Sequence, residues 1–356
     1  MEYYVGELSR PYLRTLSLMP ENQETPIHFL KTWITPEKYF YRRNHFSYPM
    51  LSPHAFFLPI TGEVKQTLIF PYCYLKSLSS KSVTMVLECS GNKRSRFSPR
   101  VYGEQWEDGA ISQGVWKGVA LRDLLNMSGL NSAAVEVVFE GYDYGKRTDM
   151  EGIFHYARSL PMEKAMHQDT IIAYELNGKS IPYAQGGPFR LIIPQWYAMA
   201  SVKWLKQITV IDHNFDGPFQ TVDYIYYPHK EDDIGKKPVT NIKTDSIIQQ
   251  PLSYTTLDTG VHNINGIAWT GYGTITDVEL SFDEGTTWKR AKLRKDTNQQ
   301  YAWTFWEYQW NVEEEGEYTI MCRAKDSTGG VQPLEAEWNR KGYGYNAVYT
   351  IKVKVE

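Results

Sequence analysis

The chain has 356 residues, of which 42% are hydrophobic and 22% charged, so it is long enough for two domains and is neither disordered nor collagen-like. Its formal net charge of -3 creates no global field that would favour nucleic acid or an anionic membrane, and no run of about 18 apolar residues occurs. We therefore expect no nucleic-acid partner and no membrane insertion.

Two local features bear on redox state and location. The three cysteines, Cys73, Cys89 and Cys322, are scattered and form no CxxC pair, which argues against a disulfide framework or a zinc knuckle. The N-terminal sequence MEYYVGELSR lacks the basic and apolar regions of a signal peptide. The expected location is cytoplasmic, or periplasmic if a leader has been removed.

Residues 55–225 mix short β-rich runs with helix-like runs, which predicts an α+β domain. The β-rich runs include 83–89 and 189–196. A helix is predicted over 117–130, ending at Gly129. Its apolar residues at helical spacing are Val119, Leu121, Leu124, Leu125 and Met127.

The composition changes between Pro228 and Pro251, where aromatic residues become rare and charged residues frequent. We interpret 229–250 as a solvated linker between domains at 1–228 and 251–356. In the second domain, apolar residues alternate by twos over several runs that turn sequences separate. The pattern predicts an antiparallel immunoglobulin-like β-sandwich, with Cys322 packed in its core.

The segment LECSGNKRSRFSPR, residues 87–100, is the most informative in the chain. A predicted strand ends at Cys89 and is followed by a Gly-Asn turn and four cations, Lys93, Arg94, Arg96 and Arg100. Nearby positive charge favours a thiolate, which can act as a nucleophile or as a metal ligand. The alternative is a buried cysteine that precedes a solvated basic loop, and the residues alone leave both open.

Two further basic elements flank this segment. YFYRRNHFSYP, residues 39–49, places Arg42, Arg43, Asn44 and His45 between aromatic residues, a pattern that also suits an RNA contact or a surface loop. Residues 186–204 place Arg190 and Lys203 at the two ends of an apolar run. A buried cation needs an anion, supplied either by a ligand or by a salt bridge within the protein.

In this order, the three elements resemble the sulfite oxidase family of molybdopterin enzymes. The resemblance also rests on Trp116-Lys117-Gly118 before Leu121 to Leu125, Gly141-Tyr142-Asp143, Gly187-Pro188-Phe189-Arg190, Val202-Lys203-Trp204-Leu205, and Trp338-Asn339 with Gly342 and Asn346. It implies a mixed α/β molybdopterin-binding domain followed by an immunoglobulin-like dimerisation domain, and hence a homodimer.

The resemblance also implies roles for individual residues. Cys89 would bind molybdenum, while Arg43 and Arg94 would face an oxyanion substrate. Tyr224 and Trp106 match residues of the catalytic pocket. The molybdopterin would be held by Arg43, Asn44, His45, Asp143, Gln185, Arg190, Ser201 and Lys203, with Gln185 standing where the family often has histidine.

The implied reaction is a two-electron oxygen-atom transfer on a small sulfur compound or oxyanion, with sulfite-to-sulfate oxidation as the first candidate. The chain carries no haem or nicotinamide signature, so electrons would leave to a separate partner such as a cytochrome. The family has a substrate arginine in an SGGGR-like segment, whereas this chain reads TGYGT and ends on Thr274. The true substrate therefore stays open, as do a reductase on the same fold and a catalytically silent binding protein.

Overall fold

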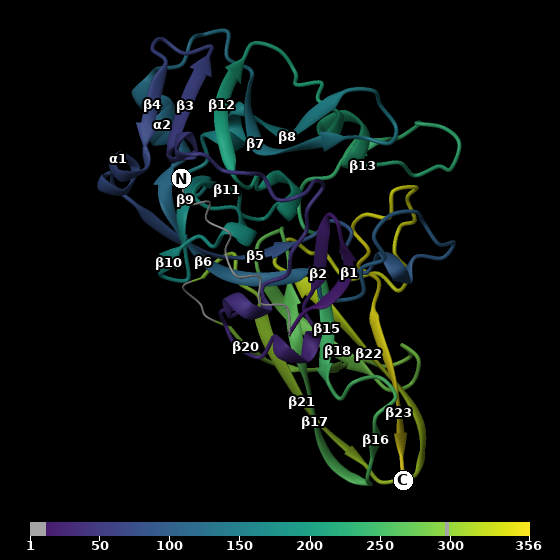
Figure 1. Ribbon diagram of the computed structural model, residues 1–356. Coiled ribbons are helices and arrows are strands. Elements are labelled where there is room, and N and C mark those ends of the chain that lie inside the picture. Colours follow the sequence, from purple (N-terminus) through teal and green to yellow (C-terminus); the bar gives the residue numbers. More distant parts are fainter. Residues whose placement is uncertain (1–11, 296–298) are drawn as a thin grey trace.

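The computed structural model describes residues 12–295 and 299–356, and the N-terminal decapeptide considered above lies outside them. In Figure 1 the first domain lies above and the green to yellow strands of the second domain extend below it. None of the helices in the described residues is long and apolar enough to cross a membrane.

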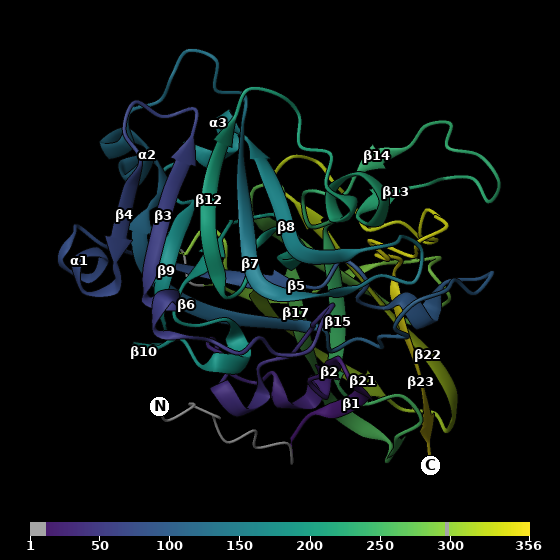
Figure 2. The same cartoon turned by 45° about the horizontal axis from the view of Figure 1, so that its top comes forward.

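Two five-stranded sheets form the first domain, and Figure 2 shows the strands of the second of them side by side. The first sheet has the order β10-β9-β6-β5, with β11 also paired to β9, and its strands are β5 Lys81–Glu88, β6 Ile111–Ala120, β9 Ile171–Leu176, β10 Lys179–Ser180 and β11 Arg190–Ile192. The second has the order β4-β3-β12-β7-β8, from β3 Phe57–Gly62, β4 Leu68–Pro71, β7 Glu136–Lys146, β8 Ile153–Pro161 and β12 Leu205–Ile211.

Short elements complete this domain. They are the β1 Arg14–Leu18 and β2 Glu21–Glu24 hairpin, the helices α1 Tyr72–Ser77, α2 Leu121–Ser128 and α3 Met162–Ala165, and the pair β13 Ile225–Tyr226 and β14 Lys237–Pro238. The structure thus confirms a mixed α/β first domain, in which strands outnumber helices.

The helix predicted over 117–130 is shorter than expected. Residues 117–120 continue β6, because Val119 pairs with Ile172 of β9 and an added Cβ at Gly118 would lie 2.1 Å from the Ile172 carbonyl oxygen. The helical part is α2, which Gly129 ends at a φ of 67°, as predicted. Met127 is 43% exposed, so it does not belong to the apolar face.

The second domain is a sandwich of two sheets, as the alternation predicts. One has the order β15-β17-β21-β20, from β15 Asp245–Gln250, β17 Gly260–Trp269, β20 Lys292–Arg294 and β21 Thr304–Val312. The other has the order β16-β23-β22-β18-β19, from β16 Thr256–Leu257, β18 Ile275–Ser281, β19 Lys289–Arg290, β22 Gly316–Asp326 and β23 Tyr349–Val355. Cys322 is fully buried between them, which confirms its core position.

The solvated linker predicted over 229–250 is only partly correct. Residues 229–238 are exposed, whereas 245–250 form β15, which pairs with β17 and is buried except at its last residue. The polar composition of this strand wrongly predicted exposure to solvent. Asp245, Ser246 and Gln249 are instead buried and bind partners at the boundary between the two domains. The core is continuous across that boundary.

Candidate functional site

Cys89 lies directly after β5, in a turn that hydrogen bonds hold closed. Its N–H donates to the Ala110 carbonyl over 2.9 Å, and the Asn92 N–H donates to the Cys89 carbonyl over 2.9 Å. The Asn92 side-chain oxygen accepts from the Ala110 N–H at 3.0 Å. The turn therefore keeps the thiol at a fixed place at the end of the strand, 8% exposed.

The four cations that follow Cys89 do not converge on it, contrary to the sequence expectation. Lys93 binds Asp245, Arg96 pairs with Asp108 at 2.7 Å, and Arg100 donates to Gln105 at 3.1 Å. Among the four, Arg94 alone reaches the cavity beside the thiol. The second cation near Cys89 is Arg43, which comes from the other basic element.

Burial therefore outweighs positive charge at this thiol. It raises the pKa of Cys89 above the ordinary value, although Arg43, Arg94 and the Gly91 N–H each act to lower it. The expectation that the protein alone makes this thiol unusually acidic is wrong. A bound metal ion deprotonates a coordinating thiol outright, so Cys89 retains its suitability as a metal ligand.

An inner cavity opens on one side of Cys89. Most of its lining is buried, and it brings together every residue that the resemblance assigns to the cofactor: Arg43, Asn44, His45, Asp143, Gln185, Arg190, Ser201 and Lys203. These residues come from the loop after β2, from β7, and from the segment 185–203 around β11. Three cations thus face one carboxylate, which gives the cavity an excess of positive charge.

Burial shifts the pKa values of several charged groups of the inner cavity. Burial lowers the pKa of Lys203 far below its ordinary value, with Arg190 adding to the effect, and lowers the pKa of Arg190 to about 10. Burial also raises the pKa of Asp143 to about 7, against the influence of Lys203. The Asp143 Oδ1 and the Arg190 Nε make no hydrogen bond. An anionic ligand with polar groups would satisfy this set.

His45 and Tyr224 contact each other in the lining of both cavities that border Cys89. The His45 Nε2 and the Tyr224 hydroxyl lie 2.6 Å apart. Burial, together with Arg43, Arg147 and Lys203, lowers the pKa of His45 far below its usual value, while burial raises that of Tyr224. Both side chains are therefore neutral, and they share one hydrogen bond near the metal-binding position proposed below.

A wider outer pocket of about 430 Å³ also borders Cys89. It shares Arg43, His45, Cys89 and Tyr224 with the inner cavity. Its other charged residues are Arg94, Glu104, Lys146, Arg147, Asp149, Asp223 and Lys341. With Arg43, five of its charged residues are basic and three are acidic, so the pocket favours an anion. Tyr102, which also lines the pocket, is 97% exposed.

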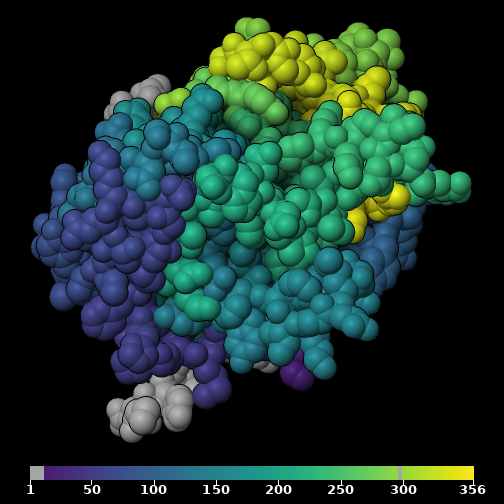
Figure 3. Space-filling model, turned by 90° about the horizontal axis from the view of Figure 1, so that it is seen from above, coloured from purple at the N-terminus to yellow at the C-terminus, as the bar shows by residue number. Residues whose placement is uncertain are grey.

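The sandwich domain holds Arg94 in this pocket. The Arg94 Nε donates to the carbonyls of Lys341 and Gly342 over 3.1 and 3.2 Å. Its guanidinium carbon lies 5.1 Å from the centre of the Tyr343 ring. Gly91 leaves the necessary room, because a Cβ there would lie 2.6 Å from the Arg94 Nη2. Figure 3 shows yellow C-terminal residues on the same face as the green and blue segments of the first domain.

Sequence reasoning missed other residues that line the two cavities. Arg147 binds Asp223 at 2.5 Å and Asp149 at 2.7 Å at the outer pocket, and Tyr156 lines the inner cavity. No local motif marks these positions. The fold brings them to the site from the loop after β7, from β8 and from the segment before β13.

Two predicted residues lie elsewhere. Trp106 is fully buried in the apolar cluster that also contains Cys89, and it lines neither cavity. Thr274 lines a separate cavity with Lys295 and Trp303, and its N–H donates to Ser327. The structure thus contradicts the interpretation that position 274 belongs to the anion pocket, because Thr274 lines neither of the two cavities that border Cys89.

Comparisons with known proteins agree with this arrangement. Residues 45–219 match a family model described as an oxidoreductase molybdopterin binding domain, and residues 236–356 match one described as a Mo-co oxidoreductase dimerisation domain. The chain is 33% identical to the mitochondrial sulfite oxidase of Rattus norvegicus over 373 residues, which cover 99% of this chain and 67% of the rat protein.

Two further relatives extend the comparison. The sulfite oxidase of Gallus gallus is 33% identical over 95% of this chain and 77% of its own length. The solved structure of the sulfane dehydrogenase SoxCD from Paracoccus pantotrophus has a TM-score of 0.80 at 26% identity, covering 98% of this chain and 86% of that one. The chain belongs to the sulfite oxidase family of molybdopterin-dependent oxidoreductases.

Proposed function

We propose that this oxidoreductase oxidises a small anionic sulfur compound, with sulfite as the first candidate substrate. The observation that carries the proposal is the place of Cys89, where a cation-rich inner cavity meets a cation-rich outer pocket. The names of the relatives support a sulfur substrate, since they act on sulfite or on sulfane sulfur.

The residues of the inner cavity fit a molybdopterin. Arg190 and Lys203 would carry the positive charge that its phosphate needs, because a bound anion favours their protonated forms, and Asp143 Oδ1 and Arg190 Nε would bond its polar groups. No group of three or more His, Cys, Asp or Glu gathers within residues 12–295 and 299–356 in a way that could hold a metal ion. Cys89 would thus be the single protein ligand of the molybdenum, next to the sulfurs of the pterin.

The outer pocket would bind and orient the substrate. When bound, the molybdenum cofactor supplies the oxygen-atom transfer and accepts two electrons. Arg43 and Arg94 would hold the oxygens of the anion next to Cys89, since guanidinium groups bind oxyanions through paired hydrogen bonds. Tyr224, fixed by His45, would place its hydroxyl at the same spot. Electrons would pass to a separate partner such as a cytochrome.

The first test is the metal itself. Purified protein should contain about one molybdenum and one pterin per chain. Cys89→Ser should abolish activity and the sulfur-to-metal charge-transfer absorption while it leaves the melting temperature within a few degrees of the wild type. Cys73→Ser is the matched control, because Cys73 is an exposed cysteine outside both cavities. An unchanged absorption band in Cys89→Ser, or molybdenum-free protein from cells that make the cofactor, would contradict the assignment.

The second test concerns the reaction. Sulfite, thiosulfate and nitrate should be compared with the loaded enzyme, using an oxidised dye as acceptor and a reduced dye as donor. We expect sulfite-dependent dye reduction. Faster nitrate-dependent oxidation of the reduced dye would instead identify a reductase, and a metal-loaded protein inert in every assay would contradict the proposed substrates.

A further inference from the structure

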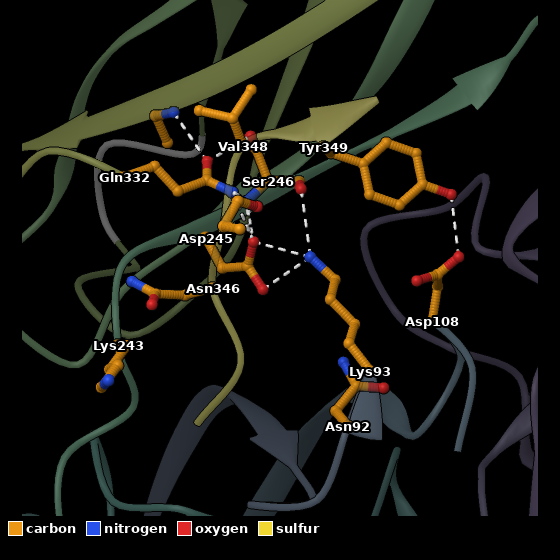
Figure 4. Close-up of polar contacts among 12 residues, drawn as sticks. Asn92, Lys93, Asp108, Lys243, Asp245, Ser246, Gln332, Asn346, Val348 and Tyr349 are labelled. Atoms are coloured by element: carbon orange, nitrogen blue, oxygen red, sulfur yellow. Dashed lines mark hydrogen bonds and ion pairs between the residues drawn. The ribbon is translucent and has the colours of Figure 1, made fainter. Parts of the chain in front are cut away.

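A fully buried lysine joins the Cys89 turn to the sandwich domain. The Lys93 Nζ lies 2.6 and 2.7 Å from the two carboxylate oxygens of Asp245 and donates to the Ser246 carbonyl at 3.3 Å (Figure 4). The same ammonium group lies 5.4 and 5.2 Å from the ring centres of Trp269 and Tyr349. Every one of these partners belongs to the second domain.

Other groups of the sandwich domain hold the Asp245 carboxylate in place. The Gln332 Nε2 and the Ser246 N–H donate to the Asp245 Oδ1 at 2.7 and 2.8 Å, and Gln332 also donates to the Ala347 carbonyl at 3.0 Å. Asp245 starts β15, a strand paired along its length with β17. The Asp245 carboxylate is therefore held at a fixed place, and Lys93 reaches it from the Cys89 turn.

Two further contacts hold the same turn to the same domain. Before Cys89, the Glu88 Oε2 accepts from the Trp269 Nε1 at 2.8 Å, while its Oε1 accepts from Asn92 at 3.0 Å. Within the turn, the Ser90 carbonyl accepts from the Gly344 N–H at 2.7 Å. The sandwich domain thus contacts the turn on both sides of the thiol and inside it.

The backbone conformation of Lys93 lets the side chains of Lys93 and Arg94 point in different directions. Lys93 has a φ of 61° and a ψ of 19°, a left-handed conformation that residues other than glycine rarely adopt. This conformation sends Lys93 into the sandwich domain and the next residue, Arg94, to the outer pocket. A buried ion pair adds little stability over apolar packing, so fixing one arrangement is the better account of its presence.

We propose that the Lys93–Asp245 pair is a latch through which the sandwich domain positions Cys89 and Arg94 for the reaction. Lys93 and Asp245 are positioning residues, since neither lines the inner cavity or the outer pocket. The catalytic consequence rests on the proposed function, in which Cys89 binds the metal. The structural consequence, an ordered turn at 89–96, does not depend on the proposed function.

The test uses Lys93→Met, Asp245→Asn and the double variant. Each single change leaves one buried charge unpaired and should lower the melting temperature by on the order of 10 °C. The double variant removes both charges of the pair, while Glu88 keeps its hydrogen bonds to Trp269 and Asn92, and it should melt within about 3 °C of the wild type. Asp245→Asn is the mildest change, because it keeps an oxygen for Gln332 and Ser246. Arg323→Met is the control, as it breaks the Arg323–Glu279 pair inside the sandwich domain.

Hydrogen exchange in cofactor-free protein measures the latch directly. The amides of 89–96 should exchange about tenfold faster in all three variants, the double variant included, and remain unchanged in Arg323→Met. In the loaded double variant we expect a shifted charge-transfer band and a kcat reduced at least tenfold. Wild-type exchange at 89–96 in the double variant would overturn the latch. Faster exchange combined with an unchanged band and kcat would overturn its role in positioning. An unchanged band in Cys89→Ser would reject the metal assignment alone.

Discussion

Lys93 and Arg94 are adjacent in the chain and identical in charge, yet they enter different environments. Lys93 is fully buried against Asp245, whereas Arg94 is held by carbonyl oxygens at the wall of the outer pocket. The difference follows from one left-handed residue. Counting cations near a cysteine therefore overestimates their effect on its pKa, because the backbone decides which of them face the thiol.

Arg94 offers a residue-scale prediction about substrate binding. Arg94→Met should raise the KM for sulfite about ten- to hundredfold, because the loss of a charged hydrogen-bond donor costs roughly 1.5–3 kcal/mol. Arg94→Lys keeps the charge and should have a smaller effect. Steady-state kinetics with a dye acceptor measure both, and a KM within twofold of the wild type in Arg94→Met would contradict a substrate role.

At Thr274, in contrast to Arg94, we expect a substitution to leave the KM for sulfite unchanged. Because it lines a cavity with Lys295 and Trp303 rather than the outer pocket, an arginine there cannot reach an anion near Cys89. Thr274→Arg should leave the KM for sulfite within twofold. A strong fall in KM would show that the turn before β18 moves toward the substrate.

At the scale of elements, the strands of the sandwich could be predicted because their apolar residues alternate by twos. Val278, Leu280 and Ile320 are all fully buried, as that pattern requires. The start of α2 could not be predicted, since Val119 satisfies the helical spacing equally well as part of β6. Pairing with β9, a contact with residues far along the chain, decides its conformation.

The residues of the candidate site also fall into those that the sequence could predict and those that it could not. Cys89, Arg43 and the residues around Arg190 belong to local motifs, so the sequence places them in one site through family resemblance. Arg147 and Tyr156 belong to no motif and reach the cavities only because β7 and β8 fold toward them. Trp106, which the resemblance assigned to the catalytic pocket, packs in the core instead. Packing sets the direction of a side chain, and the spacing of residues in a motif does not predict it.

Gly118 leads to a prediction for the first sheet. A methyl group at this position would lie 2.1 Å from the Ile172 carbonyl oxygen and 2.6 Å from the Ala173 Cα. Gly118→Ala should lower the free energy of unfolding by about 1–3 kcal/mol, because two paired strands must separate to admit it. Denaturant unfolding measures the loss, with the neighbouring Lys117→Ala as control. Equal stabilities of the two variants would contradict the tight approach of β6 and β9.

At the scale of the whole molecule, the match of residues 236–356 to a dimerisation domain leads us to expect a homodimer. The sandwich domain leaves several apolar side chains exposed, among them Tyr254 at 84%, Val261 at 67% and Leu334 at 63%. Light scattering should give about twice the 41.3 kDa of the chain, and a mass near 41.3 kDa across micromolar concentrations would contradict the dimer.

The meeting of two cavities at Cys89 separates two binding tasks that a single pocket would combine. The outer pocket has an exposed edge at Tyr102, so substrate and product can exchange without any rearrangement of the fold. The inner cavity is lined mostly by buried residues from distant parts of the chain, so a bound cofactor would touch several segments at once. Loosening any one of these segments should therefore weaken cofactor binding more than it slows the exchange of substrate and product.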